Sequence, residues 1–152
     1  MRLTKLGHVL LAVRDLARAR EFYGNVLGFE VLEADPDHGG VFLTLGKGSH
    51  ILDLVPVEGE MPVLPESFAD LTPRPGLGHV AFQVDSAQDL RTAYRELKAA
   101  GVRIFAAVDH ESQESIYFCD PEANMLEIYW ERPNARDIFR NGRKDQDRPI
   151  TL

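Results

Sequence analysis

The chain has 152 residues, of which 44% are hydrophobic and 27% are charged, and its formal net charge is −7. This is about one domain's worth of chain, with the composition of an ordinary globular protein. The negative charge argues against non-specific binding to nucleic acid or to an anionic membrane. One cysteine, Cys119, excludes an intrachain disulfide, and no stretch approaches the ~18 apolar residues of a membrane span. We therefore expect a cytoplasmic protein with no nucleic-acid or membrane partner.

The first segment begins with the sequence Leu-Gly-His-Val at residues 6–9 and continues as a short apolar run to Val13. Asp15 is a good N-cap for the helical pattern that follows from Leu16 to Leu27, and Gly28 stands where a helix-terminating glycine is expected. Gly24 weakens this helix without necessarily breaking it. The strands expected in this part of the chain cover residues 6–13, 29–33, 41–45 and 50–55.

A proline-rich connection follows at residues 57–76, and we expect it to contain little regular structure. The sequence Leu-Gly-His-Val then returns at residues 77–80. Ser86 with Asp89 forms a capping pair for a second helical pattern, which Gly101 can terminate. The strands expected here cover residues 77–84, 102–108, 115–119 and 125–130.

The same order of elements therefore occurs twice. We predict an α+β fold in which two tandem βαβββ units, residues 5–56 and 77–131, form a single domain over residues 1–152. The polar tail at residues 132–152 has Ile138 and Phe139 as its expected anchors. This tail could cover a pocket, reach a partner subunit or remain solvated.

Two histidines, His8 and His79, occupy equivalent positions at the starts of the two units. A single histidine in a strand is usually structural, but a symmetric pair is harder to explain in that way. Glu127 lies among apolar and aromatic residues of the last strand, where a carboxylate is costly to bury unless it is paired or bound to a cation. Two imidazoles and one carboxylate form the facial arrangement typical of non-haem Fe(II), so we expect a metal site.

The sequence resembles the vicinal oxygen chelate superfamily, which includes glyoxalases, extradiol dioxygenases and fosfomycin- and bleomycin-resistance proteins. The matching stretches are LGHVLLAVRDLARAREFYGNVLGFEV, GLGHVAFQVDSAQDLRTAYRELKAAGV and YFCDPEANMLEIYW. The resemblance implies a curved mixed sheet around a metal held by His8, His79 and Glu127. It also implies a small-molecule substrate and a homodimer.

The extradiol dioxygenase branch is the one that the sequence resembles best. In that branch a histidine on the last strand of the first unit acts as an acid/base group, and His50 matches it. In the same enzymes a tyrosine lies ten residues before the glutamate ligand, as Tyr117 lies before Glu127. A further histidine, upstream of that tyrosine, lines their pocket. His110 is the candidate for that histidine, although its spacing to Tyr117 is shorter than in those enzymes. The resemblance thus implies an Fe(II) site at which O₂ cleaves a catechol-like ring.

Other features of the sequence keep alternatives open. Many extradiol dioxygenases have four units instead of two, and no obvious substrate-binding arginine stands close to His110 in the sequence. Glyoxalases carry an acidic ligand in each unit, and Asp53 is the only acid on the last strand of the first unit. On a regular strand Asp53 and His50 would point to opposite faces. The alternatives are a glyoxalase-type lyase or isomerase with Ni or Zn, Mn as another possible metal, and a small-molecule-binding resistance protein.

Overall fold

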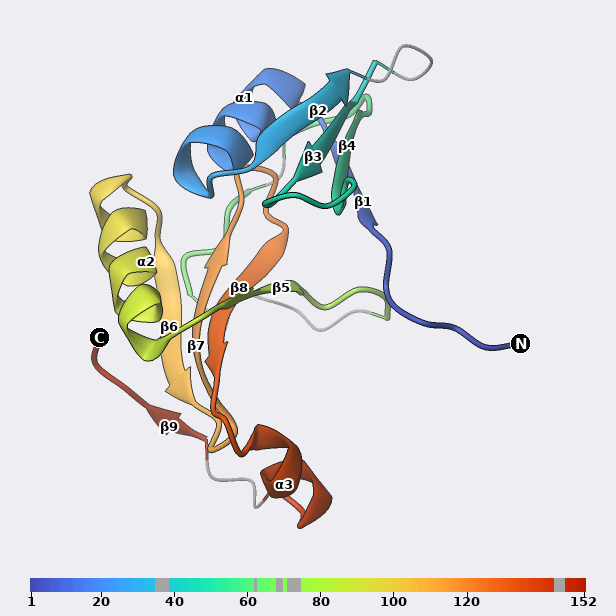
Figure 1. The fold of residues 1–152 in the computed structure, drawn as a ribbon. Coiled ribbons are helices and arrows are strands. Elements are labelled where there is room, and N and C mark those ends of the chain that lie inside the picture. Colours follow the sequence, from blue (N-terminus) through green and yellow to red (C-terminus); the bar gives the residue numbers. More distant parts are fainter. Residues whose placement is uncertain (35–38, 62, 68–69, 71–74, 144–146) are drawn as a thin grey trace. The chain divides into compact units, whose positions relative to one another are not determined.

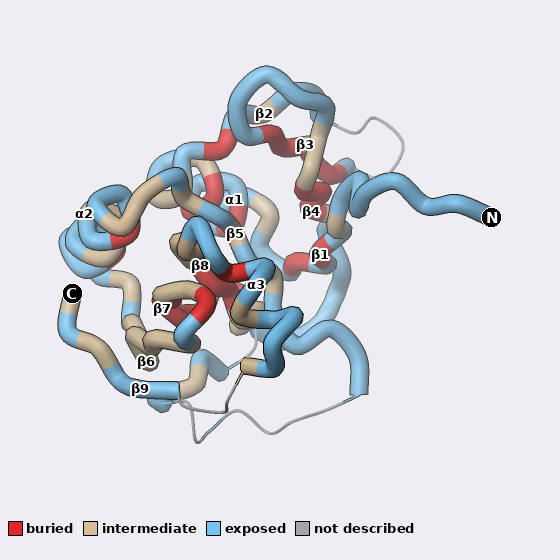
Figure 2. Tube along the Cα trace, turned by 60° about the horizontal axis from the view of Figure 1, so that its bottom comes forward, coloured by how far each residue is buried: buried red, intermediate tan, exposed pale blue. Residues whose placement is uncertain are grey.

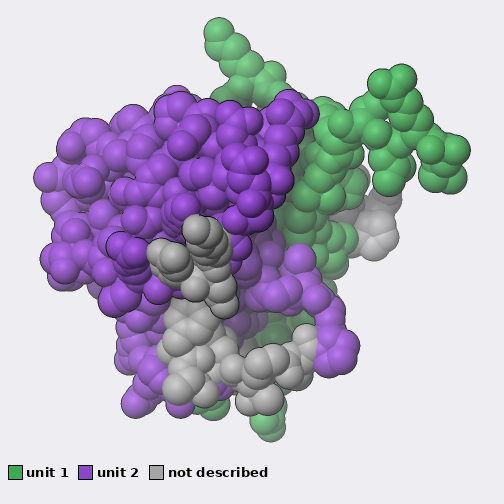
Figure 3. Space-filling view, turned by 90° about the horizontal axis from the view of Figure 1, so that it is seen from below, with its two compact units in different colours: residues 1–63 green, residues 64–152 purple. Residues whose placement is uncertain are grey.

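The computed structural model describes residues 1–34, 39–61, 63–67, 70, 75–143 and 147–152. The chain divides into two compact units, residues 1–63 and residues 64–152, which Figure 3 shows in different colours. Each unit has its own sheet and its own buried side chains and is described by itself below.

The first unit contains a four-stranded mixed sheet with the strand order β1-β4-β3-β2 (Figure 1). Strands β1 and β4 are parallel, and the other neighbouring pairs are antiparallel. The elements in chain order are β1 (Val9–Val13), α1 (Leu16–Glu21), the π-helical turn η1 (Phe22–Val26), β2 (Glu30–Ala34), β3 (Val41–Thr44) and β4 (Leu52–Pro56).

The first helix is shorter than the sequence pattern predicts. The Asp15 carboxylate accepts a hydrogen bond from the backbone N–H of Arg18, as expected of an N-cap. The α-helical geometry ends at Glu21, and the chain continues as η1, a wider turn with Gly24 at its middle. Glycine has low helix propensity, so a departure from α geometry costs little at this position. Gly28 has a φ of 76°, the left-handed conformation expected of the glycine after a helix.

The second unit contains a five-stranded sheet with the order β5-β8-β7-β6-β9, in which only β5 and β8 are parallel. Helix α2, capped by the Ser86 hydroxyl, packs against β5, β7 and β8. The elements are β5 (Val80–Val84), α2 (Ala87–Ala99), β6 (Ile104–Asp109), β7 (Gln113–Cys119), β8 (Met125–Glu131), α3 (Ala135–Arg140) and β9 (Arg148–Pro149).

These elements confirm the predicted α+β class with two βαβββ units. The unit boundaries and the single domain proposed from the sequence stay predictions. The described residues of the 57–76 connection include no α-helix or β-strand, and residues 62, 68–69 and 71–74 lie outside the described part. No helix in the described part of the chain is long and apolar enough to cross a membrane.

The tail is more ordered than its polar composition indicates, because it forms α3 and the short strand β9. The prediction that Phe139 anchors the tail was wrong, since the residue is 56% exposed. Ala135 is the buried residue of α3, and the other expected anchor, Ile138, is partly buried. A small residue can approach closely where the large apolar side chain of the same helix points to solvent.

Each unit buries its own set of aliphatic and aromatic residues, and the positions of the buried residues along the chain are red in Figure 2. In the first unit Tyr23 is fully buried and makes edge-to-face contacts with Phe22 and Phe29. In the second unit the buried residues lie on one side of α2 and in the middle of β7 and β8. They include Leu90, Leu97, Ile116, Phe118 and Leu126.

Gly40 is required by the close approach of β4. A Cβ atom added at Gly40 would overlap the backbone carbonyl oxygen of Leu54, whereas one added at Gly48 would meet nothing within 4 Å. We therefore expect Gly40→Ala to lower the free energy of unfolding by about 1–3 kcal/mol, the usual cost of overpacking. Gly48→Ala is the matched control and should change it by less than about 0.5 kcal/mol. Chemical denaturation of both variants measures the difference, and equal stabilities would contradict the proposed clash.

Cys119 lies at the end of β7 and is partly buried. Burial, with a smaller contribution from the charge of Asp120, raises the pKa of its thiol to about 11. About one molecule in a thousand then carries the reactive thiolate at pH 8. We expect iodoacetamide to modify the folded chain at least tenfold more slowly than the urea-unfolded chain at this pH. Mass spectrometry of timed samples measures both rates, and equal rates would show that the thiol is not protected.

Candidate functional site

The first unit gathers two histidines around one carboxylate. His8 directly precedes β1, and its Nε2 lies 3.7 Å from Asp53 Oδ2. His50 lies two residues before the start of β4, and its Nε2 lies 3.6 Å from Asp53 Oδ1. The two imidazole rings are 4.7 Å apart between centroids. Three groups of metal-ligand type therefore converge within this unit.

The prediction that His50 and Asp53 point to opposite faces was wrong. It assumed one regular strand over residues 50–55, but β4 begins at Leu52. The hydroxyl of Thr44 donates a hydrogen bond to the carbonyl of Ser49 at 2.9 Å and fixes the turn before His50. Strand alternation does not apply in such a turn, so His50 can reach the same side as Asp53.

The environment of Asp53 suits a divalent cation. Its side chain is 7% exposed, and Oδ1 has no hydrogen-bond partner among the described residues. One ligand atom from each of His8, His50 and Asp53 can be chosen so that all three lie within 4.8 Å of one another. Two ligands bound to one ion at ~2.1 Å lie about 3–3.5 Å apart, close to the nitrogen–oxygen separations found here. These residues could hold a divalent metal ion, and the donors alone do not identify which metal.

The second unit places the other predicted ligands side by side. His79 precedes β5, and its Nε2 lies 2.9 Å from Oε2 of Glu127 in β8. The carboxylate is buried, with 3% of Glu127 exposed. Its other oxygen, Oε1, accepts hydrogen bonds from the Ser115 hydroxyl at 2.5 Å and from the Gln113 amide at 2.8 Å. One oxygen is thus fixed by β7, and the other faces the histidine.

The strand registers show that Asp53 and Glu127 occupy equivalent positions. Asp53 pairs with Leu10, two residues after His8, and Glu127 pairs with Ala81, two residues after His79. Asp53 is therefore the counterpart of Glu127 in the first unit, although its side chain is one methylene shorter. A ligand set with one carboxylate from each unit is compatible with this arrangement.

The neighbouring strand differs between the units at two places. Tyr117 pairs with Glu127, whereas Phe42 pairs with Asp53, so the first unit has no hydroxyl at this position. Following the same registers, Gly40 stands where the second unit has Ser115. This difference explains why Glu127 Oε1 has a hydroxyl donor and Asp53 Oδ1 does not.

The predicted catalytic residues Tyr117 and His110 contact each other. The Tyr117 hydroxyl lies 2.9 Å from His110 Nε2, and the ring of Tyr117 meets that of His79 edge to face at 5.8 Å. Burial raises the pKa of the Tyr117 phenol above its usual value, and the nearby charge of Glu127 raises it further. The hydroxyl therefore remains protonated at neutral pH and serves as a hydrogen-bonding group.

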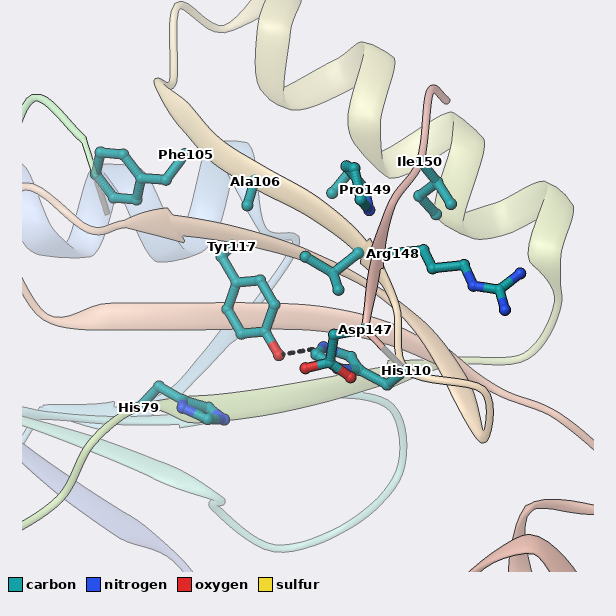
Figure 4. Close-up of a pocket in the computed structure, with 11 residues that line it drawn as sticks. His79, Phe105, Ala106, His110, Tyr117, Asp147, Arg148, Pro149 and Ile150 are labelled. Carbon is teal, nitrogen blue, oxygen red and sulfur yellow. Dashed lines mark hydrogen bonds and ion pairs between the residues drawn. The ribbon is translucent and has the colours of Figure 1, made fainter. Parts of the chain in front are cut away.

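These residues line a pocket of about 740 Å³ within the second unit (Figure 4). Its polar end is formed by His79, Tyr117, His110 and Asp147. The rest of the wall is mainly apolar and comes from β6 and the tail. Its other lining residues are Phe105, Ala106, Ala107, Val108, Arg148, Pro149 and Ile150. A ligand with an apolar body and one polar edge matches this distribution.

The tail takes part in this pocket, which was one of three alternatives for it in the sequence. Asp147 Oδ1 lies 2.8 Å from His110 Nδ1 and 3.1 Å from Arg143 Nη1. Arg143 also donates a hydrogen bond to the backbone carbonyl of His110. An arginine is therefore close to His110 in space, although none was apparent nearby in the sequence. The two residues are separated in the sequence by β7, β8 and α3, so only the fold brings them together.

Sequence reasoning missed Gln113, Ser115 and Asp147 as neighbours of the site. The strand alternation of β7 contains a signal for the first two, since both have the same parity as Tyr117 and face the same side. No comparable signal exists for Asp147. The structure brings together His79 with Glu127, Tyr117 with His110, and His8 with His50. The triad of His8, His79 and Glu127 combines the two units, each of which is described by itself, so it stays a prediction.

Comparison with known proteins shows to which superfamily the chain belongs. Residues 5–128 match the family described as the Glyoxalase/Bleomycin resistance protein/Dioxygenase superfamily. The chain is 30% identical over 132 residues to a catechol-2,3-dioxygenase of Bacillus subtilis, covering 87% of this chain and 43% of that protein. It is 35% identical over 107 residues to the mitochondrial methylmalonyl-CoA epimerase of Bos taurus, covering 68% of this chain and 58% of that protein.

Both of these curated relatives are considerably longer than the stretch that matches. Among solved structures, a glyoxylase/bleomycin resistance protein/dioxygenase domain from Frankia sp. EAN1pec is 27% identical with a TM-score of 0.69. That match covers 86% of this chain and all of the Frankia chain. The chain therefore belongs to the Glyoxalase/Bleomycin resistance protein/Dioxygenase superfamily.

Proposed function

We propose that the protein is an Fe(II)-dependent extradiol dioxygenase that cleaves a catechol-like ring, with His8, His79 and Glu127 as metal ligands. The observation that carries this proposal is the hydrogen-bonded pair of Tyr117 and His110 in a pocket that His79 also lines. A phenol that remains protonated can hydrogen-bond a catechol oxygen next to the metal. The mainly apolar wall of the pocket suits the aromatic ring.

Each residue has a definite task in this proposal. Bound Fe(II) would supply a template that holds the two catechol oxygens and O₂ next to one another. Ser115 and Gln113 hold Oε1 of Glu127, so Oε2 would be the oxygen that binds the metal. Tyr117 and His110 bind the substrate edge.

His50 is the proposed acid/base group. The Ser49 hydroxyl lies 3.2 Å from its Nδ1, while its Nε2 faces Asp53. An imidazole can take a proton from a catechol hydroxyl and return it to an oxygen of the product. The proposal includes O₂ as co-substrate and a homodimer, as the family resemblance implies.

A second candidate is a lyase or isomerase that uses Ni or Zn. The equivalence of Asp53 and Glu127 in the strand registers favours this class, because it provides a carboxylate in each unit. Such an enzyme would move a proton next to a chelated oxygen and need no O₂. The epimerase relative belongs to this kind of chemistry by its name, and the catechol dioxygenase relative to the first kind.

Anaerobic reconstitution with Fe(II), followed by catechols and oxygen, tests the main proposal. We expect oxygen uptake with a yellow ring-opened product, recorded by an oxygen electrode and by absorbance. His79→Ala should lose bound iron and activity, and Tyr117→Phe should retain iron while kcat falls about 10- to 100-fold. His8→Ala should also lose iron if the triad is correct.

Controls in the same assay separate the candidates. Ni(II)- or Zn(II)-loaded protein with a hemithioacetal, or with a CoA thioester in deuterated water, detects lyase or epimerase turnover. Turnover there without oxygen uptake from any catechol would overturn the dioxygenase proposal. Ligand binding without turnover in either assay would favour a small-molecule-binding protein.

Asp53→Asn distinguishes a three-ligand site from a four-ligand site. An amide is a poorer ligand than a carboxylate and has nearly the same size. Under the dioxygenase proposal Asp53 is not a ligand, so we expect the iron content by elemental analysis to remain within about twofold of wild type. Glu58→Gln, which removes an exposed carboxylate from the same unit, is the matched control. A loss of metal in Asp53→Asn alone would instead support the four-ligand enzyme.

A further inference from the structure

The tail reaches His110 from two directions. Strand β9 pairs with β6, and the backbone N–H of Ile150 donates to the carbonyl of Ala107 at 3.0 Å. Just before β9, the Asp147 carboxylate meets the outer edge of the His110 ring. The inner edge of that ring faces the Tyr117 hydroxyl, as Figure 4 shows. A series of side-chain contacts therefore runs from the 41% exposed carboxylate of Asp147 through His110 to the buried phenol of Tyr117.

The chemistry of the three groups determines which of them donates in each hydrogen bond. A carboxylate can only accept a hydrogen bond, so a hydrogen atom must reside on Nδ1 of His110 for the 2.8 Å contact to be favourable. In a neutral imidazole the other nitrogen, Nε2, is then an acceptor. In its contact with Nε2 the Tyr117 hydroxyl is therefore the donor.

We propose that Asp147 is a positioning residue that fixes the tautomer of His110 and thereby directs the Tyr117 hydroxyl. Arg143 supports this role, because its guanidinium bonds both Asp147 Oδ1 and the carbonyl of His110. The tail thus sets the direction of the hydrogen bond between His110 and Tyr117. The consequence for turnover rests on the proposed function, whereas the tautomer does not.

The contact is not needed simply to attach the tail. Backbone pairing of β9 with β6 already anchors residues 148–150. Loss of the Asp147 carboxylate would leave that pairing intact and remove only the side-chain contacts with His110 and Arg143. A purely structural role and a positioning role therefore predict different results for conservative variants.

The full chain, labelled with ¹⁵N in its histidines and studied with and without Zn(II), provides the test. Two-dimensional NMR at alkaline pH reports which ring nitrogen carries the hydrogen, and His110→Gln identifies the signal. We expect the Nδ1–H form in the wild type. Asp147→Asn can still accept from Nδ1–H and should keep this form, whereas Asp147→Ala should change to the Nε2–H form. Asp137→Ala, which removes another carboxylate of the tail, should leave the ring unchanged.

Turnover of the Fe(II) protein with catechol provides the second readout. We expect kcat to fall about 10- to 100-fold in Asp147→Ala, to recover to within about fivefold of wild type in Asp147→Asn, and KM to change less than kcat. A wild-type ring in the Nε2–H form, or an unchanged tautomer in Asp147→Ala, would overturn the inference. Absence of wild-type turnover would overturn the proposed function alone, because the NMR result does not depend on activity.

Discussion

The buried carboxylate of Glu127 is the constraint on which the second unit depends. A charged group of this kind is stable in the interior only when each oxygen has a partner. Ser115 and Gln113 on β7 provide donors for one oxygen, and His79 faces the other. The antiparallel pairing of β7 with β8 and the parallel pairing of β8 with β5 bring these groups together.

The two units share one topology but differ in how their carboxylates are held. Asp53 has the equivalent register position, yet Gly40 replaces the serine that would supply a donor. A side chain at Gly40 would collide with the backbone of β4, so the first unit cannot have the same hydrogen bond. His50 faces Oδ1 of Asp53, which has no hydrogen-bond partner among the described residues, and His8 faces Oδ2. A buried carboxylate that lacks a donor in this way is suited to a cation.

The tail connects the polar end of the pocket to the surface. Its contacts with His110 come from residues that follow the βαβββ unit, so they are independent of the repeat. The same segment contributes Pro149 and Ile150 to the apolar wall. Changes in this segment can therefore alter both ligand fit and hydrogen-bond direction while the two sheets remain the same.

The sequence by itself determined the α+β class and the repeated order of elements, because hydrophobic periodicity and the duplicated motif are local signals. The structure also places His79 beside Glu127, two of the residues that the family resemblance named as ligands. The sequence pattern failed at His50, where the strand begins two residues later than the pattern indicates. Only the tertiary structure brought Asp147 to His110 and showed the equivalence of Asp53 with Glu127. Strand register, and the packing of a polar tail against an earlier strand, depend on pairing between residues that are distant in the sequence. No local pattern specifies such pairing.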